Sequence, residues 1–86
     1  MFYVYVLQSS KNGQLYTGST SDLRKRFKEH NSGLSEYTKH RGPYTLLYYE
    51  ACGNELDARE REKYLKTGMG KRFLRNRIKR SLPLTG

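Results

Sequence analysis

The stretch LYTGSTSDLRKRFKEH, residues 15–30, changes from the pattern of a strand to the pattern of a helix across a turn of small residues. After the turn, the spacing i, i+3, i+4 and i+7 is occupied by Leu23, Arg26, Phe27 and His30. Residues at this spacing share one side of an α-helix. The two apolar side chains can therefore anchor the helix on a sheet, and the sequence predicts that Arg26 and His30 project at the edge of that contact.

Upstream of this stretch, residues 2–8 (FYVYVLQ) are aromatic and β-branched and predict a strand. Because side chains alternate along a strand, Tyr3 and Tyr5 are expected on one face and the valines that follow them on the other. Asn12 and Gly13 predict a type I′ turn, in which both central residues have positive φ. The strand that opens the stretch above would then return antiparallel to the first.

Capping residues and periodicity predict the elements that follow. Thr20 or Ser21 is expected to cap the first helix. The segment YTLLYYE, residues 44–50, predicts a third strand. A second helix is expected between Asn54 as its cap and Gly68 just past its end.

The last periodic segment, KRFLRNRIKR (71–80), predicts a short basic helix, and a short helical turn is expected near residues 35–38. The order ββαβαα describes an α/β (α+β) fold with a small, three-stranded, largely antiparallel sheet flanked by helices. We expect one domain over residues 1–80 and a flexible C-terminal tail over residues 81–86.

The chain is strongly basic, and its charge is unevenly distributed. Lys and Arg number 17 of 86 residues against 8 Asp and Glu, the formal net charge is +9, and no acidic residue follows Glu62. This balance favours a polyanionic partner such as DNA, with RNA as an alternative, over a merely solvated basic tail. The residues predicted to contact phosphates are Lys63, Lys66, Lys71, Arg72, Arg75 and Arg77.

A membrane is not expected as a partner. The apolar residues of the basic segment, Phe73, Leu74 and Ile78, are about what one helix needs to dock on its own domain. Cys52 is the only cysteine, which excludes an intramolecular disulfide and fits a reduced, cytoplasmic location.

Several residues have the chemistry that phosphodiester hydrolysis needs: an activated water, stabilised phosphate charge and, commonly, a metal ion. The candidates are Tyr5, Tyr16, Arg26, His30 and Glu62. Each also has a simpler explanation, because strand tyrosines usually pack, a single histidine usually forms a hydrogen bond, and a run of charges usually faces solvent. Glu62 nevertheless follows Ala58 by four residues and precedes Leu65 by three, a spacing that predicts its side chain on the packed side of the helix.

The order and spacing of these residues resemble the GIY-YIG endonuclease superfamily over nearly the whole chain. Residues 3–5 (Tyr-Val-Tyr) stand at the first half-motif, with Tyr3 in place of its glycine, and residues 16–18 (Tyr-Thr-Gly) form the second. The motif glycine is Gly18, which would also allow a nucleic-acid backbone to come close. Asn76 lies near an asparagine that the family often carries, and we assign it no role.

The remaining positions of the resemblance lie on the predicted helices. Arg26 lies eight residues beyond the motif glycine, as the family's arginine does, and His30 follows one turn later. Glu62 after Ala58 matches the Ala-x-x-x-Glu context of the family's metal-binding glutamate. The chain is similar to short, stand-alone bacterial members related to the structure-specific nuclease branch.

The resemblance implies an endonuclease that cuts one DNA strand with a single Mg²⁺ or Mn²⁺. Tyr16 would act as general base or water positioner, with support from Tyr5, and Arg26 would stabilise the charged phosphate. His30 would orient the nucleophile or relay its proton, and it is the rival candidate for the base. Glu62 would hold the metal ion.

Three classes of function remain open from the sequence. The first is a metal-dependent endonuclease, with structure-selective cleavage in DNA repair or recombination as its expected setting. The second is a non-cleaving nucleic-acid-binding module with the same fold, and the third is a structural RNA-associated protein. The set of five candidate residues favours the enzyme, because a binder has no need of a carboxylate beside phosphate. With no second binding domain, we expect weak intrinsic specificity or a protein partner that supplies targeting.

Overall fold

A computed structural model of the chain describes residues 1–34, 39 and 41–82. The elements, in chain order, are β1 (Phe2–Ser9), β2 (Leu15–Thr20), α1 (Leu23–Asn31), β3 (Tyr44–Cys52), α2 (Glu55–Leu65), α3 (Gly68–Arg77) and a 3₁₀ turn, η1 (Lys79–Ser81). This order confirms the predicted ββαβαα arrangement. The helical turn expected near residues 35–38 lies outside the described residues.

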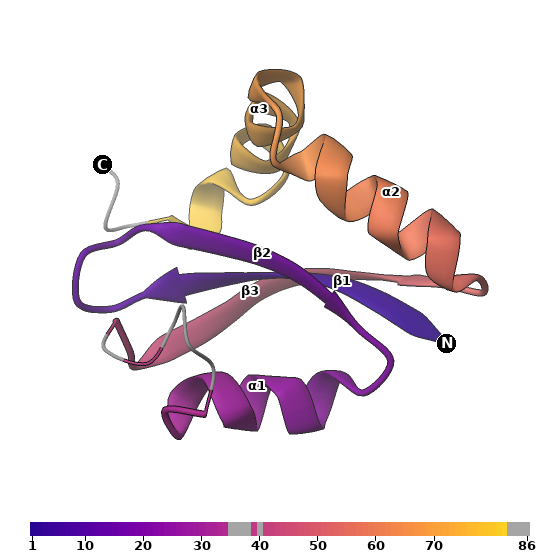
Figure 1. Ribbon diagram of the computed structural model, residues 1–86. Coiled ribbons are helices and arrows are strands. Elements are labelled where there is room, and N and C mark those ends of the chain that lie inside the picture. Colours follow the sequence, from indigo (N-terminus) through magenta and orange to yellow (C-terminus); the bar gives the residue numbers. More distant parts are fainter. Residues whose placement is uncertain (35–38, 40, 83–86) are drawn as a thin grey trace.

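The three strands form one antiparallel sheet in the order β2-β1-β3. Helix α1 covers one face of this sheet, whereas α2 and α3 cover the other (Figure 1). In the central strand, Tyr5 lies opposite Gly18 of β2 and Tyr49 of β3. The sheet therefore has two edge strands, and β2 is the edge that carries the second half-motif.

Alternation along β1 places its side chains on two opposite faces, as the sequence predicted, and each face contributes to a separate core. Val4 and Val6 are fully buried against the side chains of α2 and α3, including Leu65 and Leu74. The other face of β1 contributes Tyr5 and Leu7 to a smaller cluster that Leu23 and Phe27 of α1 complete. Each face of the short central strand is thus buried under a helix, which explains why the strand is apolar on both sides.

The loop between β1 and β2 differs from the predicted type I′ turn. Gly13 has a φ of 74°, but Asn12 does not adopt a positive φ. The hydroxyl of Ser9 accepts hydrogen bonds from the backbone N–H groups of Lys11 and Asn12, at 3.1 and 3.3 Å. The side chain of Asn12 accepts another from the N–H of Gln14, at 3.0 Å. These side-chain bonds stabilise a wider loop, so the two-residue turn is not formed.

Two helix ends also differ from the prediction. The N-cap of α1 is Asp22, whose side chain accepts a hydrogen bond from the N–H of Lys25, so neither Thr20 nor Ser21 has that role. Gly68 is the first residue of α3 and not a left-handed C-terminal cap, because Thr67 already caps the next helix.

Close packing of α2 on α3 explains the second glycine in this region. A Cβ atom at Gly70 would collide with the carbonyl oxygen of Tyr64 and lie 2.5 Å from the Cα of Leu65. The end of α2 can therefore lie against the start of α3 only if this position lacks a side chain.

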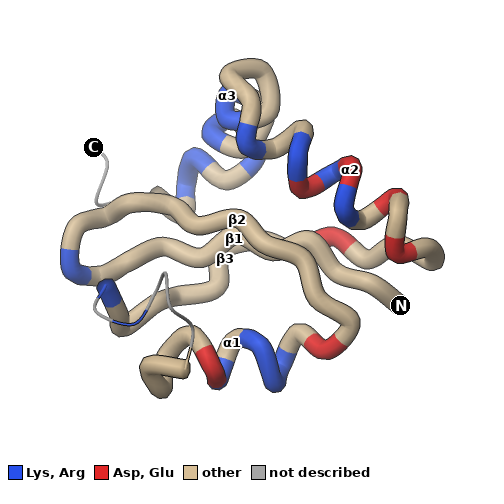
Figure 2. Tube along the Cα trace, viewed as in Figure 1, with Lys and Arg blue, Asp and Glu red and all other residues tan. Residues whose placement is uncertain are grey.

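Basic residues gather on α3 and the turn after it, while acidic residues lie mainly along α2 (Figure 2). The chain remains packed as far as Leu82, which is 7% exposed and lies in the stretch expected as a flexible tail from residue 81. The rest of that predicted tail lies outside the described residues. Within the described part of the chain, no helix is both long enough and apolar enough to cross a membrane.

Candidate active site

Tyr5, Tyr16 and His30 form an aromatic cluster between the sheet and α1. The hydroxyl of Tyr5 and the Nε2 atom of His30 are joined by a hydrogen bond of 2.8 Å. The ring of Tyr16 meets the His30 ring edge-on, with 5.0 Å between centroids. Tyr5 and His30 are each 1% exposed, whereas Tyr16 is half-buried on the edge strand. Of the three rings, Tyr16 is therefore the one that a substrate can reach.

The same burial sets the protonation of this cluster. Burial, together with repulsion from Tyr16, raises the pKa of Tyr5 to about 12, and a hydrogen bond from Arg26 partly opposes this rise. Burial, together with the positive charge of Arg26, lowers the pKa of His30 to about 4. At neutral pH both groups are uncharged, so they can exchange hydrogen bonds without a buried charge.

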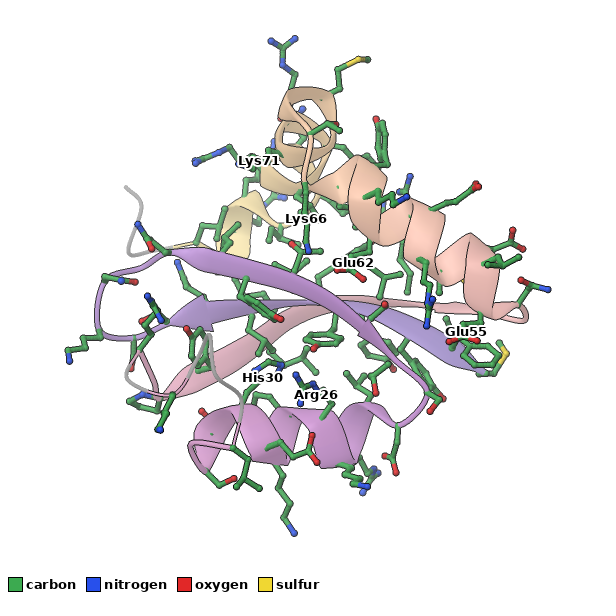
Figure 3. All side chains as sticks on the ribbon, in the orientation of Figure 1. Arg26, His30, Glu55, Glu62, Lys66 and Lys71 are labelled. Carbon is green, nitrogen blue, oxygen red and sulfur yellow. The ribbon has the colours of Figure 1, made fainter. Side chains whose placement is uncertain are left out.

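Arg26 lies beside this cluster at the margin of the packed face, where the helical phase of α1 predicted it (Figure 3). Its Nη1 atom donates to Oε1 of Glu29 at 2.9 Å, and its side chain is 34% exposed. That hydrogen bond, outweighing partial burial, raises the pKa of Arg26, and a bond to Tyr5 adds to the rise. The guanidinium is thus held near Tyr5 while part of it remains accessible to a ligand.

The structure explains why residue 18 is a glycine, for a reason that the sequence did not indicate. A Cβ atom at this position would lie 2.5 Å from the hydroxyl oxygen of Tyr5 and 2.7 Å from its Cζ atom. The tyrosine ring of the central strand therefore lies directly over the glycine of the edge strand. The close approach that requires this glycine is made by the protein's own side chain.

Glu62 lies on the other side of the sheet, between α2 and β2, whereas Arg26 and His30 lie on the α1 side (Figure 3). Its Oε1 atom accepts a 2.6 Å hydrogen bond from the hydroxyl of Ser19, the neighbour of Gly18 on the edge strand. Its Oε2 atom accepts a 2.7 Å bond from Nζ of Lys66. Burial alone would raise the pKa of Glu62, but the bonds from Lys66 and Ser19 outweigh it and lower the pKa below its usual range.

The donor set at Glu62 fits a single hard cation. The carboxylate is kept ionised, Ser19 fixes its direction, and the ammonium group of Lys66 already occupies the position of a cation next to Oε2. Among the described residues, no group of three or more His, Cys, Asp or Glu side chains is placed to share a metal ion. One carboxylate with water and phosphate oxygens is a coordination that Mg²⁺ commonly accepts.

A groove of about 690 Å³ runs between the β1–β2 loop and the α2–α3 pair. Tyr16 of the edge strand lies along it, and its opposite side is formed in part by Lys66, Lys71 and Arg75. The groove therefore joins the accessible tyrosine of one face to the basic side chains of the other.

The other predicted binding residues have different surroundings. Lys63 and Arg72 are exposed on α2 and α3. Arg77 lies near Tyr48 and Glu50 of β3. Burial raises the pKa of Tyr48, and the hydrogen bond and charge of Arg77 oppose this rise, while the same charge helps to lower the pKa of Glu50. The ring of Tyr3 packs against Tyr49, 6.1 Å between centroids, on the side of the sheet away from the groove.

Comparison with known proteins decides the family. The GIY-YIG catalytic domain matches residues 1–77. The chain belongs to the GIY-YIG family. It is also 48% identical to the UPF0213 protein CPE1444 of Clostridium perfringens over 77% of this chain and 71% of that protein. The UPF0213 protein SSP2268 of Staphylococcus saprophyticus is 41% identical over 76% and 79% of the two chains.

A solved structure supports the same assignment. The solution NMR structure of the UPF0213 protein BH0048 from Bacillus halodurans matches with a TM-score of 0.53 and 36% sequence identity. The match covers 86% of this chain and 82% of that one. This GIY-YIG chain therefore has the three-stranded fold of its UPF0213 relatives.

Sequence reasoning missed two partners of the site in this GIY-YIG domain. Lys66 was assigned to phosphate binding alone, although its i, i+4 spacing from Glu62 is that of a helical ion pair. Ser19 was given no role. Its odd position on β2, next to Gly18, was the available signal, because it points Ser19 to the face opposite Tyr16.

Proposed function

We propose that this GIY-YIG protein is a metal-dependent endonuclease that hydrolyses phosphodiester bonds of DNA. The observation that carries the proposal is the gathering of phenol, guanidinium and carboxylate groups around residues 16–19 of one edge strand. Tyr16 and Arg26 lie on one side of this strand, and Glu62 is bonded to it from the other. Because β2 is an edge strand, its outer edge leaves room for a phosphate between these groups.

Tyr16 is the proposed general base or water positioner, because it is the accessible ring of the cluster. The accessible part of Arg26 is suited to stabilise charge that grows on the phosphate, since its planar fork matches two phosphate oxygens. Tyr5 supports Tyr16 from behind. The burial and low pKa of His30 favour a role in positioning Tyr5 over the role of base.

Glu62 is the proposed ligand of a single Mg²⁺ or Mn²⁺. When bound, such an ion offsets phosphate charge and assists departure of the leaving oxygen. The part of the protein itself is to keep the carboxylate ionised and aimed along the edge strand, which the bonds from Ser19 and Lys66 support.

Lys71 and Arg75 are proposed to bind the sugar-phosphate backbone along the groove, with Lys63 and Arg72 extending the basic surface. Selection of branched or damaged DNA in repair or recombination, and a partner that directs the enzyme there, are further parts of this proposal. A non-cleaving binding module is the second candidate. Against it, an ionised Glu62 beside the phosphate path would repel the ligand unless a cation intervenes.

The test is strand cleavage of a panel of branched and duplex DNA with Mg²⁺ or Mn²⁺. Glu62→Gln removes the charge with little change of shape, and we expect cleavage to collapse while DNA binding without metal holds or tightens. Glu60→Gln is the matched control, because Glu60 is exposed on the same helix. If the unaltered chain binds the panel but never cuts it, the binding module is the correct function.

A further inference from the structure

The Glu62 carboxylate is held by two donors that come from different elements. Ser19 is on a β-strand and donates to Oε1, whereas Lys66 follows the last turn of α2 and donates to Oε2. The side chain of Lys66 is 53% exposed and that of Glu62 only 23% exposed. An ion pair with one such exposed partner is weak. The lysine can therefore leave at little cost while the carboxylate stays in place.

Lys66 also borders the groove, where a bound phosphate is a second anionic partner for its ammonium group. Together with Lys71 and Arg75 it lines the groove beside the edge strand. A phosphate chain in that groove is attracted to all three cations. The four-carbon stem of lysine lets its ammonium group exchange between a carboxylate and a phosphate.

We propose that Lys66 is an exchangeable counter-cation that occupies the metal-facing oxygen of Glu62 until nucleic acid draws it into the groove. This inference rests on the proposed function. Before substrate binds, the lysine offsets the carboxylate that would repel the phosphate. After substrate binds, the same oxygen is released for the divalent cation. Binding of nucleic acid and binding of metal thus strengthen each other.

The physical reason is competition at one oxygen atom. An ammonium group 2.7 Å from Oε2 and a divalent cation cannot share that position without strong repulsion. Because coupling between two ligands is reciprocal, the lysine must weaken metal binding in the free protein and must also make DNA binding depend on the metal.

The first experiment measures Mn²⁺ affinity of the full chain without DNA, from the electron paramagnetic resonance signal of free Mn²⁺. Lys66→Met removes the competing cation, and the strength of an exposed ion pair predicts an affinity gain of roughly 1.4- to fivefold. Lys63→Met is the matched control. It causes the same loss of charge on the same helix, at a position adjacent to Glu62 in sequence and therefore on a different side, so we expect almost no gain.

The second experiment measures the coupling in a Tyr16→Phe background, which keeps the DNA intact. Fluorescence anisotropy gives the affinity for a labelled DNA with and without Mn²⁺. The Mn²⁺-dependent gain should be smaller in the Lys66→Met variant than in the Lys63→Met variant.

Equal Mn²⁺ affinities in the two lysine variants would overturn the exchange, and Lys66→Gln repeats the comparison should the methionine alter folding. A further arm distinguishes this inference from the proposed function. If Glu62→Gln abolishes Mn²⁺ binding while Lys66→Met leaves it unchanged, only the exchange is wrong. If Glu62→Gln leaves Mn²⁺ affinity unchanged, Glu62 is not the ligand and both proposals fail.

Discussion

Replacing Gly18 with alanine tests the contact that holds the candidate site together. The added Cβ would lie 2.5 Å from the Tyr5 hydroxyl oxygen and 2.7 Å from its Cζ, well inside van der Waals contact. The φ angle of Gly18 is not in the left-handed region, so the backbone itself accepts alanine. The cost is therefore the collision alone. Tyr5 cannot swing into solvent, because it is 1% exposed and hydrogen-bonded to His30.

The size of the effect follows from overpacking of a buried ring. Such changes commonly cost about 1–3 kcal/mol. For a domain of this length, each kcal/mol corresponds to a fall in Tm of about 4–8 °C. We therefore expect Gly18→Ala to lower the Tm by roughly 5–20 °C in circular dichroism melts, with a matching loss in urea unfolding. Gly53→Ala is the control, since its Cβ would meet nothing within 4 Å, and we expect a change below about 0.5 kcal/mol.

A second substitution tests the cause. Tyr5→Phe removes the oxygen that lies 2.5 Å from the new Cβ but keeps the ring carbon at 2.7 Å, so it should relieve part of the collision. The double variant should then be more stable than the sum of the two single changes predicts. Equal losses for Gly18→Ala and Gly53→Ala would refute the contact. Native stability with impaired cleavage would instead mean that the glycine admits the substrate, as the sequence first indicated.

Three further predictions concern charge. Arg26→Ala should lower kcat by about 10²–10³ with little effect on DNA affinity, and Arg26→Lys should restore only part of it in single-turnover assays, because lysine lacks the planar fork. In the folded chain the pKa of His30 is about 4, so His30 stays neutral until the pH approaches that value. In the unfolded chain, His30 takes up its proton once the pH falls below about 6.5. Stability should then decrease by up to about 3 kcal/mol between pH 7 and pH 4, and His30→Gln should remove that part of the slope in urea titrations. Reversing Lys71 and Arg75 to glutamate should reduce the slope of log K against log salt, measured by anisotropy, by about 0.9 for each duplex phosphate that the protein no longer neutralises.

Each of these has a clear contrary result. Full activity of Arg26→Lys would limit Arg26 to a point charge. An unchanged pH slope in His30→Gln would mean that His30 is not the buried neutral group. An unchanged salt slope would place the DNA outside the groove of Lys71 and Arg75.

The fold could be predicted because its main signals are local and repeated. Alternation in β1 assigns Tyr5 and Val4 to opposite faces, and the helical phase of α1 brings Arg26 and His30 to the sheet. Both patterns were confirmed, since each depends on the backbone period and on burial of one face. Local signals failed where two residues compete for one role. Asp22, and neither of the two residues before it, caps α1. The side chain of Asn12 accepts a hydrogen bond within the loop for which a type I′ turn was predicted.

The contacts of the candidate site were harder to predict because they join distant segments. The residue type at Gly18 identified the motif, but only the three-dimensional structure relates the glycine to the ring of Tyr5. In the same way, the phase of α2 indicated that Glu62 faces inward, but not that Ser19 meets it. Sequence spacing indicates which side a residue faces, whereas its partner depends on how the elements pack.

The edge strand β2 connects the two halves of the candidate site through the alternation of its side chains. Tyr16 and Gly18 face α1, where the tyrosine cluster lies, while Ser19 faces α2 and holds Glu62. For a carboxylate and a phenol to approach one phosphate from opposite faces of the sheet, they must be separated by about one strand. That strand must also be an edge strand, because only an edge strand leaves room for the phosphate beside it. The register of β2 therefore matters more than any one of its residues. A one-residue shift would exchange the two faces and leave both halves without their partners.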